Sequence, residues 1–464
     1  MSSGAAQFGR LERRGALLGL SGWQLGLIGG AVFVAVAAVR GAGGAGLAWA
    51  APLWLLLLAA GFLSVGGRSV PAWAPVMTAW LRARASGRTR AASRPQTRPG
   101  VLKLPGLAGA LELVPSDRLS GVLVVDRRAA TVVAVARVRA SGFLLDDDAS
   151  QEHKVAAWGR VLGGLCQQAA VLRIQVLTTI TAGGAAPARR WWREHCMTDD
   201  AGPAAVLADL LDEGIARATR REHLVAIAVR SPQGHRRLTA AVADAIAGVF
   251  AGVGDSLGAA ELTVDGWLDE QDLARSVRRA YDPHTSFDDI DVHAPTPVGV
   301  AERWDRWQTG TTWHATYWVA EWPRTAIDPT FLQPLTTGNT GVRVVSLTAE
   351  PVPAREALRQ IRRARAEYKA DAAQRQRIGQ VEDRSVQAEV EDLDRREAEL
   401  VAGHGDLRFT GLVSVSAPEP EALTNACREV EADAARAMCD LVRLVGQQGA
   451  AHLAAALPLA RSIR

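Results

Sequence analysis

Residues 17–65 read LLGLSGWQLGLIGGAVFVAVAAV (Leu17–Val39), RGAGGAG (Arg40–Gly46) and LAWAAPLWLLLLAAGFLSV (Leu47–Val65). The first and third segments hold 23 and 19 residues, and neither contains a charged side chain. An apolar helix of about 20 residues crosses the hydrocarbon core of a bilayer, which is about 30 Å thick. Within lipid, a single span must be helical because only a helix satisfies all of its own backbone hydrogen bonds. The pattern therefore predicts a helical hairpin through a membrane, with the glycine-rich segment as its turn.

Tryptophans lie near the ends of both predicted spans, where indole rings favour the membrane interface. Two alternatives are a pair of buried helices in a soluble core and a cleaved signal peptide. Uncharged windows of this length are typical of membrane spans, and the apolar part of a signal peptide holds only about 7–15 residues. The residues that define the predicted transmembrane hairpin are Leu17, Trp23, Val39, Leu47, Trp54 and Val65.

Basic residues flank the hairpin on both sides, whereas its turn carries only Arg40. Basic flanks remain on the cytoplasmic side of a membrane. We therefore expect a two-span protein of the cell (inner, cytoplasmic) membrane with both termini in the cytoplasm. The flanking basic residues are Arg10, Arg13 and Arg14 before the hairpin, and Arg68, Arg82, Arg84, Arg88, Arg90, Arg94, Arg98 and Lys103 after it.

The segment after the hairpin is basic and contains two prolines. Arg82–Gly100 reads RARASGRTRAASRPQTRPG, which predicts a flexible tether within a juxtamembrane region, 66–100. A basic residue near an anionic leaflet contributes about 1 kcal/mol, so we expect membrane lipid to be its partner. Nucleic acid is the alternative, but the remaining chain is nearly neutral, which argues against a direct and specific nucleic-acid surface. The predicted lipid-headgroup contacts are Arg82, Arg84, Arg88 and Arg90.

The rest of the chain predicts layered α/β (α+β) structure in two cytoplasmic regions, 101–290 and 291–464, after a short N-terminal segment, 1–16. β-Branched runs indicate the strands, and apolar residues at i, i+3, i+4 and i+7 indicate the helices. Aromatic residues gather in Trp304–Trp322, where they favour core packing over the stacking of bases or flat ligands. We expect strands at Gly121–Val125, Thr131–Val138, Val171–Thr179, His223–Val229, Ala260–Val264, Gly341–Ala349 and Phe409–Ser416. We expect one helix that is capped by Asp148 or Ser150 and runs to Gln168, and further helices at Ala204–Thr219, Leu238–Val253, Leu268–Arg279 and Glu419–Gln448.

Residues 355–402 predict a long charged helix or a helical hairpin. The first half is basic, the second half is acidic, and Gly379 lies between them. If the chain turns near Gly379, the two halves can pair with opposite charges facing; otherwise they form one helix of about 70 Å. A narrow apolar stripe on the second half predicts contact with a second copy or a companion subunit. Its residues are Val386, Val390, Leu393 and Leu400.

The sequence shows no catalytic, metal or cofactor constellation. No G-x-x-x-x-G-K-[ST] loop is present to hold a nucleotide phosphate. Gly254–Gly258 (GDSLG) matches G-x-S-x-G, but a predicted helix precedes it and a strand follows, which is the reverse of the order that exposes a nucleophilic serine. We read it as a loop at a helix C-terminus. The four cysteines form no C-x-x-C pair. We therefore expect a non-enzyme without cofactor.

The order of parts resembles components of conjugation machines. The two-span N-terminus and basic tether resemble PrgI-type and TcpE-type membrane proteins. Four C-terminal segments resemble the non-catalytic N-terminal domain of TraC-like type IV secretion ATPases, and two central segments resemble an actinobacterial membrane-protein family found with conjugation genes. The resemblance implies a scaffold subunit that works beside a separate ATPase and other secretion subunits, in a complex with several copies. The segments are EPVPAREALRQ (Glu350–Gln360), REAELVAGHGDLRFTG (Arg396–Gly411), VSVSAPEPEAL (Val413–Leu423), GQQGAAHLAAALPLAR (Gly446–Arg461), RRAYDPHT (Arg278–Thr285) and WHATYWVAEWP (Trp313–Pro323).

Two other readings compete with this one. The type VII secretion subunit EccE also has two N-terminal spans and a cytoplasmic α/β domain, and Gly121–Thr179 suits either family. A membrane-tethered serine hydrolase built on Ser256 is the third reading. The cargo, the partner ATPase and the stoichiometry stay open at this point.

Overall fold

The structure is a computed structural model. It describes residues 22–65, 68–92, 100–140, 142–182, 192, 194–195, 202–213, 219–284, 296–297, 299–323, 328–337, 341–378, 384–402 and 405–462. The chain divides into two compact units. One unit, the body, comprises Thr89–Pro353 and Gly405–Arg464 as its main segments, and the other contains residues 9–88 and 354–404.

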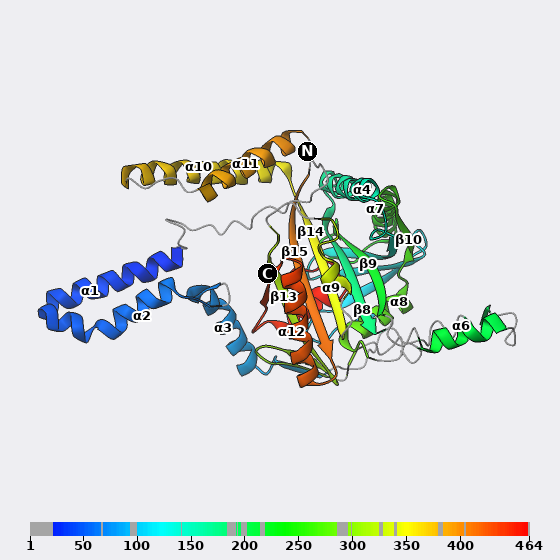
Figure 1. Ribbon diagram of the computed structural model, residues 1–464, viewed down its shortest axis with the longest axis horizontal. Helices are drawn as coiled ribbons and strands as arrows, with labels where there is room; N and C mark the ends of the chain where they lie inside the picture. Colours follow the sequence, from blue (N-terminus) through cyan, green and yellow to red (C-terminus); the bar gives the residue numbers. More distant parts are fainter. Residues whose placement is uncertain are drawn as a thin grey trace. The chain divides into compact units, whose positions relative to one another are not determined.

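A single antiparallel sheet of 14 strands forms the body (Figure 1). The strand order is β3-β11-β12-β13-β15-β14-β8-β9-β7-β6-β5-β4, with β10 also paired to β7 and β16 to β13. The predicted α/β fold class is confirmed. Residues of both predicted regions, 101–290 and 291–464, contribute strands to this one sheet, and the β8–β14 pairing joins them.

The first half of the sheet follows the predicted alternation of strands and helices. β-Branched runs form its inner strands, and a helix covers the sheet after most of them. Its elements are β4 (Val101–Leu102), β5 (Leu111–Ser116), β6 (Gly121–Asp126), β7 (Thr131–Ala140), α4 (Asp148–Gln167), β8 (Val171–Ala182), α6 (Gly202–Glu213), β9 (Thr219–Arg230), α7 (Ala240–Ala259), β10 (Leu262–Trp267) and α8 (Glu270–Tyr281).

The second half repeats this sequence of elements. An outer pair of strands leads to a long inner strand, then come a helix, two further long strands with an insertion between them, a helix, a short strand and a last helix. Its elements are β3 (Arg90–Ala92), β11 (Gly299–Glu302), β12 (Trp307–Thr309), β13 (Thr312–Glu321), α9 (Gln333–Thr337), β14 (Val342–Val352), β15 (Asp406–Ala417), α12 (Pro420–Arg436), β16 (Asp440–Arg443) and α13 (Gln448–Ala456).

Details of the backbone repeat between the halves as well. The Leu268 N–H donates to Val135 O at 2.8 Å after β10, and the Leu444 N–H donates to Thr316 O at 3.0 Å after β16. α7 and α12 are each followed by a residue with positive φ that is not glycine. These residues are Glu261 (φ 59°) and Met438 (φ 54°). The body is therefore an internal duplication in which the two halves pair through their equivalent strands β8 and β14.

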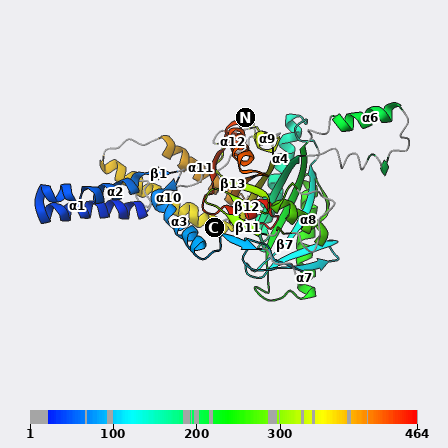
Figure 2. The same cartoon turned by 90° about the horizontal axis from the view of Figure 1, so that it is seen from below.

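Three layers make up the body. One face of the sheet packs against α8 and α13 around Leu177, Val277 and Leu453. The opposite face packs against α4 and α7 in the first half and against α12 in the second half, where α9 lies beside α12 (Figures 1 and 2). Successive side chains along each strand point to opposite faces of the sheet and pack against the helices on each side, so the sheet is buried on both faces.

Three local predictions need correction. The predicted helix Glu419–Gln448 is divided into α12, β16 and α13, because the chain turns at Met438 and Leu441 then pairs with Val319 of β13. α4 is capped by neither of the predicted residues: the Asp147 carboxylate accepts from the Ser150 N–H at 2.7 Å. The GDSLG segment lies inside α7 and not in a loop, and the Ser256 hydroxyl donates to Gly252 O at 2.9 Å.

In its described residues, the second unit consists of helices and two short strands. α1 (Gly22–Trp49) and α2 (Ala51–Phe62) precede a small β1–β2 ladder, formed by Ser64–Val65 and Arg68–Ser69, which α3 (Val70–Ala85) follows. α10 (Ala354–Ile378) and α11 (Arg384–Val401) form the insertion between β14 and β15.

Candidate functional site

α1 and α2 form an antiparallel apolar hairpin. The α1 helix is interrupted at Ala42 (φ −143°, ψ 20°) and Gly43 (φ 60°, ψ −142°), inside the predicted turn Arg40–Gly46. The two ends of the hairpin meet at its open end, where the Gln24 side chain donates to Gly61 O at 2.9 Å. A Cβ atom at Gly61 would lie 3.2 Å from Ile28 Cγ1, so glycine allows this close approach.

Large apolar side chains cover the outside of this hairpin. Trp23 is 80% exposed, Phe33 is 74% exposed and Leu56 is 65% exposed. Residues 23–49 are long and apolar enough to cross a membrane, and α2 is a shorter apolar helix. α7 also passes this test of length and composition, but it is a core helix whose Phe250 is fully buried. An exposed apolar surface of this extent marks a binding or membrane surface.

The structure places the predicted hairpin residues as follows. Trp23 and Val39 are exposed on α1, and Leu47 lies on α1 beyond its interruption. Trp54 on α2 donates from its indole nitrogen to Leu47 O at 3.3 Å. Val65 does not belong to the helix, because α2 ends at Phe62 and Val65 pairs with Arg68. Leu17 lies outside the described residues.

The predicted flexible tether is ordered over most of its described part. Arg82 and Arg84 occupy the last turn of α3, where their charge suits the helix dipole. Arg88 follows the helix, and Arg90 begins β3, which pairs with β11. For residues 82–92 the prediction of flexibility is wrong, because apolar residues at helical spacing precede the arginines and because a distant strand supplies the partner of β3. Residues 93–99 of the predicted tether lie outside the described residues. The headgroup contacts themselves stay a prediction.

The charged insertion turns back on itself. Arg365 of α10 forms ion pairs with Asp394 and, at 2.6 Å, with Glu397 of α11. Ile361, Ala364 and Leu393 are buried together between the two helices, which lie side by side in Figures 1 and 2. The hairpin alternative is therefore the correct one.

This packing uses part of the predicted partner stripe. Leu393 is only 6% exposed, and Leu400 packs against the same cluster. Val390 is half-buried, and the Val386 side chain lies outside the described residues. Leu393 and Leu400 thus help to close the hairpin, and contact of the stripe with a partner stays a prediction.

A buried polar cluster lies between β13, β15 and α13. His314 and His452 are stacked with their ring centroids 4.0 Å apart. His314 Nδ1 is 2.7 Å from Ser416 Oγ, and His452 Nδ1 is 2.8 Å from Ser414 Oγ. His452 Nε2 is 2.7 Å from Ala280 O of α8. The imidazole rings thus fasten two helices to the sheet by hydrogen bonds.

Both imidazoles are held neutral by their surroundings. Burial lowers the pKa of His452 to about 4. Burial, with the neighbouring His452, lowers the pKa of His314 well below its ordinary value. The matching strands of the first half carry aliphatic residues on this face: Val133 and Val135 on β7, and Ala226 and Ala228 on β9. The cluster is thus a feature of the second half alone.

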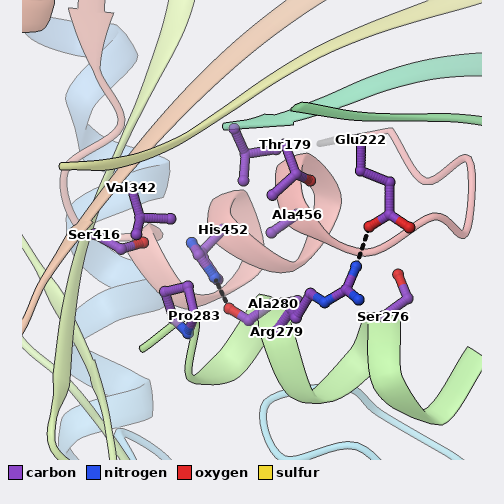
Figure 3. A pocket seen from close by; sticks show the side chains of 11 residues that line it. Thr179, Glu222, Ser276, Arg279, Ala280, Pro283, Val342, Ser416, His452 and Ala456 are labelled. Atoms are coloured by element: carbon purple, nitrogen blue, oxygen red, sulfur yellow. Dashed lines mark hydrogen bonds and ion pairs between the residues drawn. The ribbon is translucent and has the colours of Figure 1, made fainter. Parts of the chain in front are cut away.

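Space beside the cluster is very small. The cavity between α8, α13 and the sheet has a volume of about 10 Å³ and is lined by His452, Ser276 and the Glu222–Arg279 ion pair, among others (Figure 3). A cavity of this size holds about one water molecule.

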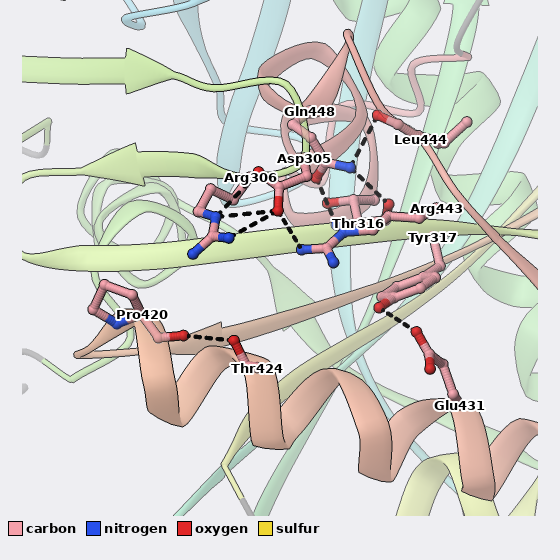
Figure 4. Close-up of polar contacts among 10 residues, drawn as sticks. All are labelled: Asp305, Arg306, Thr316, Tyr317, Pro420, Thr424, Glu431, Arg443, Leu444 and Gln448. Carbon is pink, nitrogen blue, oxygen red and sulfur yellow. Dashed lines mark hydrogen bonds and ion pairs between the residues drawn. The ribbon is translucent and has the colours of Figure 1, made fainter.

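Neighbouring polar contacts have the same structural character (Figure 4). The Gln448 side chain accepts from the Thr316 N–H at 2.8 Å and donates to Leu444 O at 2.9 Å. The Tyr317 hydroxyl donates to Glu431 at 2.8 Å. The contacts of Thr316 and Tyr317 join β13 to α13 and α12. The predicted core role of the aromatic segment is confirmed for Trp307 and Tyr317, which are 2% and 1% exposed.

The described residues contain no group of three or more histidine, cysteine, aspartate or glutamate side chains placed to hold a metal. Burial raises the pKa of Cys439 to about 11 and also raises the pKa of Cys427, so both thiols stay protonated. The sequence reasoning missed the His314–His452 cluster. Its signal is a period-two polar pattern in two strands, His314 and Thr316 in one and Ser414 and Ser416 in the other.

No protein-family model matches the sequence, and a search of curated proteins finds no similar one.

Proposed function

We propose that this chain is a membrane-anchored, non-catalytic scaffold subunit of a conjugation or type IV-like secretion machine. The observation that carries the proposal is the apolar surface of the α1–α2 hairpin, exemplified by the exposed Trp23, Phe33 and Leu56. Burying these side chains in hydrocarbon removes them from water at a gain of about 25 cal/mol per Å² of apolar area. The hairpin is the membrane anchor in this proposal.

The charges on the two sides of the hairpin support a cytoplasmic body. Arg68, Arg82, Arg84 and Arg88 follow the second helix, whereas the turn carries Arg40 alone. Basic residues are retained on the cytoplasmic side. Both ends of the hairpin, and therefore the sheet, face the cytoplasm in this proposal.

A scaffold role is supported by how the body uses its polar groups. His314, His452, Gln448 and Arg343 are buried and bonded to neighbouring elements, where they stabilise the fold. The charged α10–α11 hairpin is the proposed contact with a separate ATPase or with a second copy. The insertion is rich in charged residues of both signs, and charged surfaces guide association and choice of partner.

The type of machine rests on the sequence resemblance described above. The two-span N-terminus, the basic segment and the TraC-like C-terminal segments occur in one chain in an order that fits a conjugation subunit. An EccE-like subunit of type VII secretion has the same N-terminal order. Identifying the proteins that bind this chain would distinguish a conjugation subunit from a type VII subunit.

Membrane anchoring is tested by alkaline extraction of membranes that contain the full chain. The wild type should remain in the pellet. The double variant Phe33→Arg/Leu56→Arg should move to the soluble fraction, because each arginine at a span centre costs about 2.5–3.5 kcal/mol. The matched control is Leu145→Arg, at a position of the body that is 96% exposed, and it should behave as the wild type. A wild type that is released by alkali contradicts the proposal.

The machine is tested by purifying the tagged chain in mild detergent and identifying its companions by mass spectrometry. A TraC-like ATPase is the expected companion. Recovery of type VII subunits in its place would overturn the assignment to conjugation while keeping the scaffold role.

A further inference from the structure

α3 is a separate helix immediately after the apolar hairpin. Its 16 residues, Val70–Ala85, make it about 24 Å long at 1.5 Å per residue. That length is less than the hydrocarbon thickness of about 30 Å, and the helix carries two arginines. The short β1–β2 ladder between α2 and α3 lets the chain change direction before α3 begins. α3 thus does not extend a span.

The side chains of α3 are sorted around its axis. Trp73, Met77, Trp80, Leu81 and Arg84 follow one another at spacings of three, four or one, which places them along one side. Met77 is 49% exposed and Leu81 is 53% exposed. The guanidinium of Arg84 lies over the Trp80 ring, 5.3 Å from its centroid. This side therefore combines exposed aliphatic groups, indoles and a cation.

Charge in this part of the chain has one sign. No aspartate or glutamate occurs between Glu12 and Glu112. Arg82 and Arg84 lie in the last turn of α3, and Arg88 follows it. Tryptophan, exposed aliphatic side chains and arginines next to an apolar hairpin are residue types that favour a membrane interface.

We infer that α3 lies flat on the surface of an anionic bilayer, with Met77 and Leu81 at the boundary of the acyl chains and Arg82, Arg84 and Arg88 at the lipid phosphates. The inference rests on the proposed membrane anchor. It adds a second and different contact with lipid beside the anchor. The proposed partner of this side is a lipid surface because α3 begins eight residues after the apolar α2 ends and because the sequence around it, residues 13–111, contains arginines but no aspartate or glutamate.

The test places one environment-sensitive thiol label at a time on the full chain in vesicles of phosphatidylcholine and phosphatidylglycerol. The variants are Met77→Cys, Leu81→Cys and the matched control Thr78→Cys, which lies about 100° around the helix from Met77. Val36→Cys, on the exposed side of α1, reports on the anchor. The unsubstituted chain, labelled in parallel, supplies the baseline for the native cysteines. Brominated lipids with bromine near the headgroup or deep in the acyl chain quench the label according to its depth.

Labels at 77 and 81 should be quenched at least twofold more strongly by shallow bromine than the label at 78, whereas the label at 36 should be quenched by deep bromine. Equal and weak quenching at 77, 78 and 81, with deep quenching retained at 36, overturns the inference and leaves the anchor intact. Loss of quenching at 36 overturns the anchor and the inference together. Deep quenching at 77 and 78 alike would also overturn the inference, because α3 would then be inserted and not lying on the surface.

Discussion

Leu177 and Ser346 are opposite each other at the centre of the β8–β14 ladder. From this pair, the same order of strands leads outward in both directions: β8, β9, β7 and β6 on one side, and β14, β15, β13 and β12 on the other. The chain makes its longest insertions between equivalent strands, after β8 and after β14. The duplicated sheet thus presents two equivalent points of attachment, one of which carries the charged α10–α11 hairpin.

For the buried ion pair between Arg343 of β14 and Asp433 of α12, loss of one partner alone should lower the free energy of unfolding more than loss of both partners. Its atoms are 2.7 Å apart and both side chains are at least 94% buried. Asp433→Asn should lower the free energy of unfolding by about 3–5 kcal/mol, because it leaves a buried guanidinium without its counter-charge. In the double variant Arg343→Met/Asp433→Leu, the free energy of unfolding should decrease much less. Urea unfolding of the three proteins measures this, and equal losses in the single and double variants would contradict the interpretation.

Stability should fall in mild acid because of His452. The pKa of His452 in the native chain is about 4, compared with about 6.5 in an unfolded chain. Between these values the unfolded chain binds a proton that the native chain does not bind, so its stability is full above pH 6.5 and decreases as the pH falls toward 4. At pH 4, protonation of His452 in the unfolded chain should lower the free energy of unfolding by on the order of 3 kcal/mol.

Denaturant unfolding of the wild type and of His452→Gln at pH 7, 6 and 5 separates this contribution from the rest. The variant starts less stable at pH 7, because its hydrogen bonds to Ser414 and Ala280 change, but its stability should depend less steeply on pH. An identical slope in both proteins would show that His452 does not carry the acid sensitivity.

The α10–α11 hairpin should open when its small apolar cluster is reduced. Leu393→Ala removes the most buried residue of α11, and a buried leucine truncated to alanine costs about 2–5 kcal/mol. Hydrogen exchange should then show at least a tenfold loss of amide protection in α10 and α11, with the body unchanged. Val401→Ala, at a position 77% exposed, is the control and should exchange as the wild type. Unchanged protection in Leu393→Ala would mean that the ion pairs of Arg365 hold the hairpin.

Nucleotide binding should be absent. The sequence contains no phosphate-binding loop, and the proposed scaffold works beside a separate ATPase. Isothermal titration of the purified chain with Mg-ATP should give no saturable heat, and turnover should not exceed the buffer blank. Saturable binding at micromolar ATP would contradict the non-catalytic assignment.

Much of the sheet follows from local sequence. The β-branched runs around Val132, Val225 and Val413 predict their strands, because such residues pack well on a sheet that is covered on both faces. For residues 355–402 the sequence leaves two structures open, a helical hairpin and one long helix, since a single glycine weakens a helix by only about 1 kcal/mol. The cluster of Ile361, Ala364 and Leu393 decides between them, and it forms only when distant residues meet.

The duplication could not be read from the sequence, because the equivalent cores differ chemically. His314 and Ser416 lie on strands whose counterparts carry Val133 and Ala228. The apolar spacing of Leu423, Val430, Met438, Leu441 and Leu444 favours one continuous helix. The positive φ of Met438 and the pairing of β16 with β13 end it. Tertiary pairing also produces β3, which no local pattern predicts.

The central claim, that the hairpin crosses the membrane with both ends in the cytoplasm, is tested most directly by thiol accessibility in intact cells. Ala42→Cys places the thiol at the turn of the hairpin while leaving the positive φ of Gly43 undisturbed, and Ser86→Cys places one just after α3. A membrane-impermeant maleimide should label position 42 from outside and should label position 86 only after the cells are opened. Labelling of position 86 in intact cells, with position 42 protected, would contradict the account.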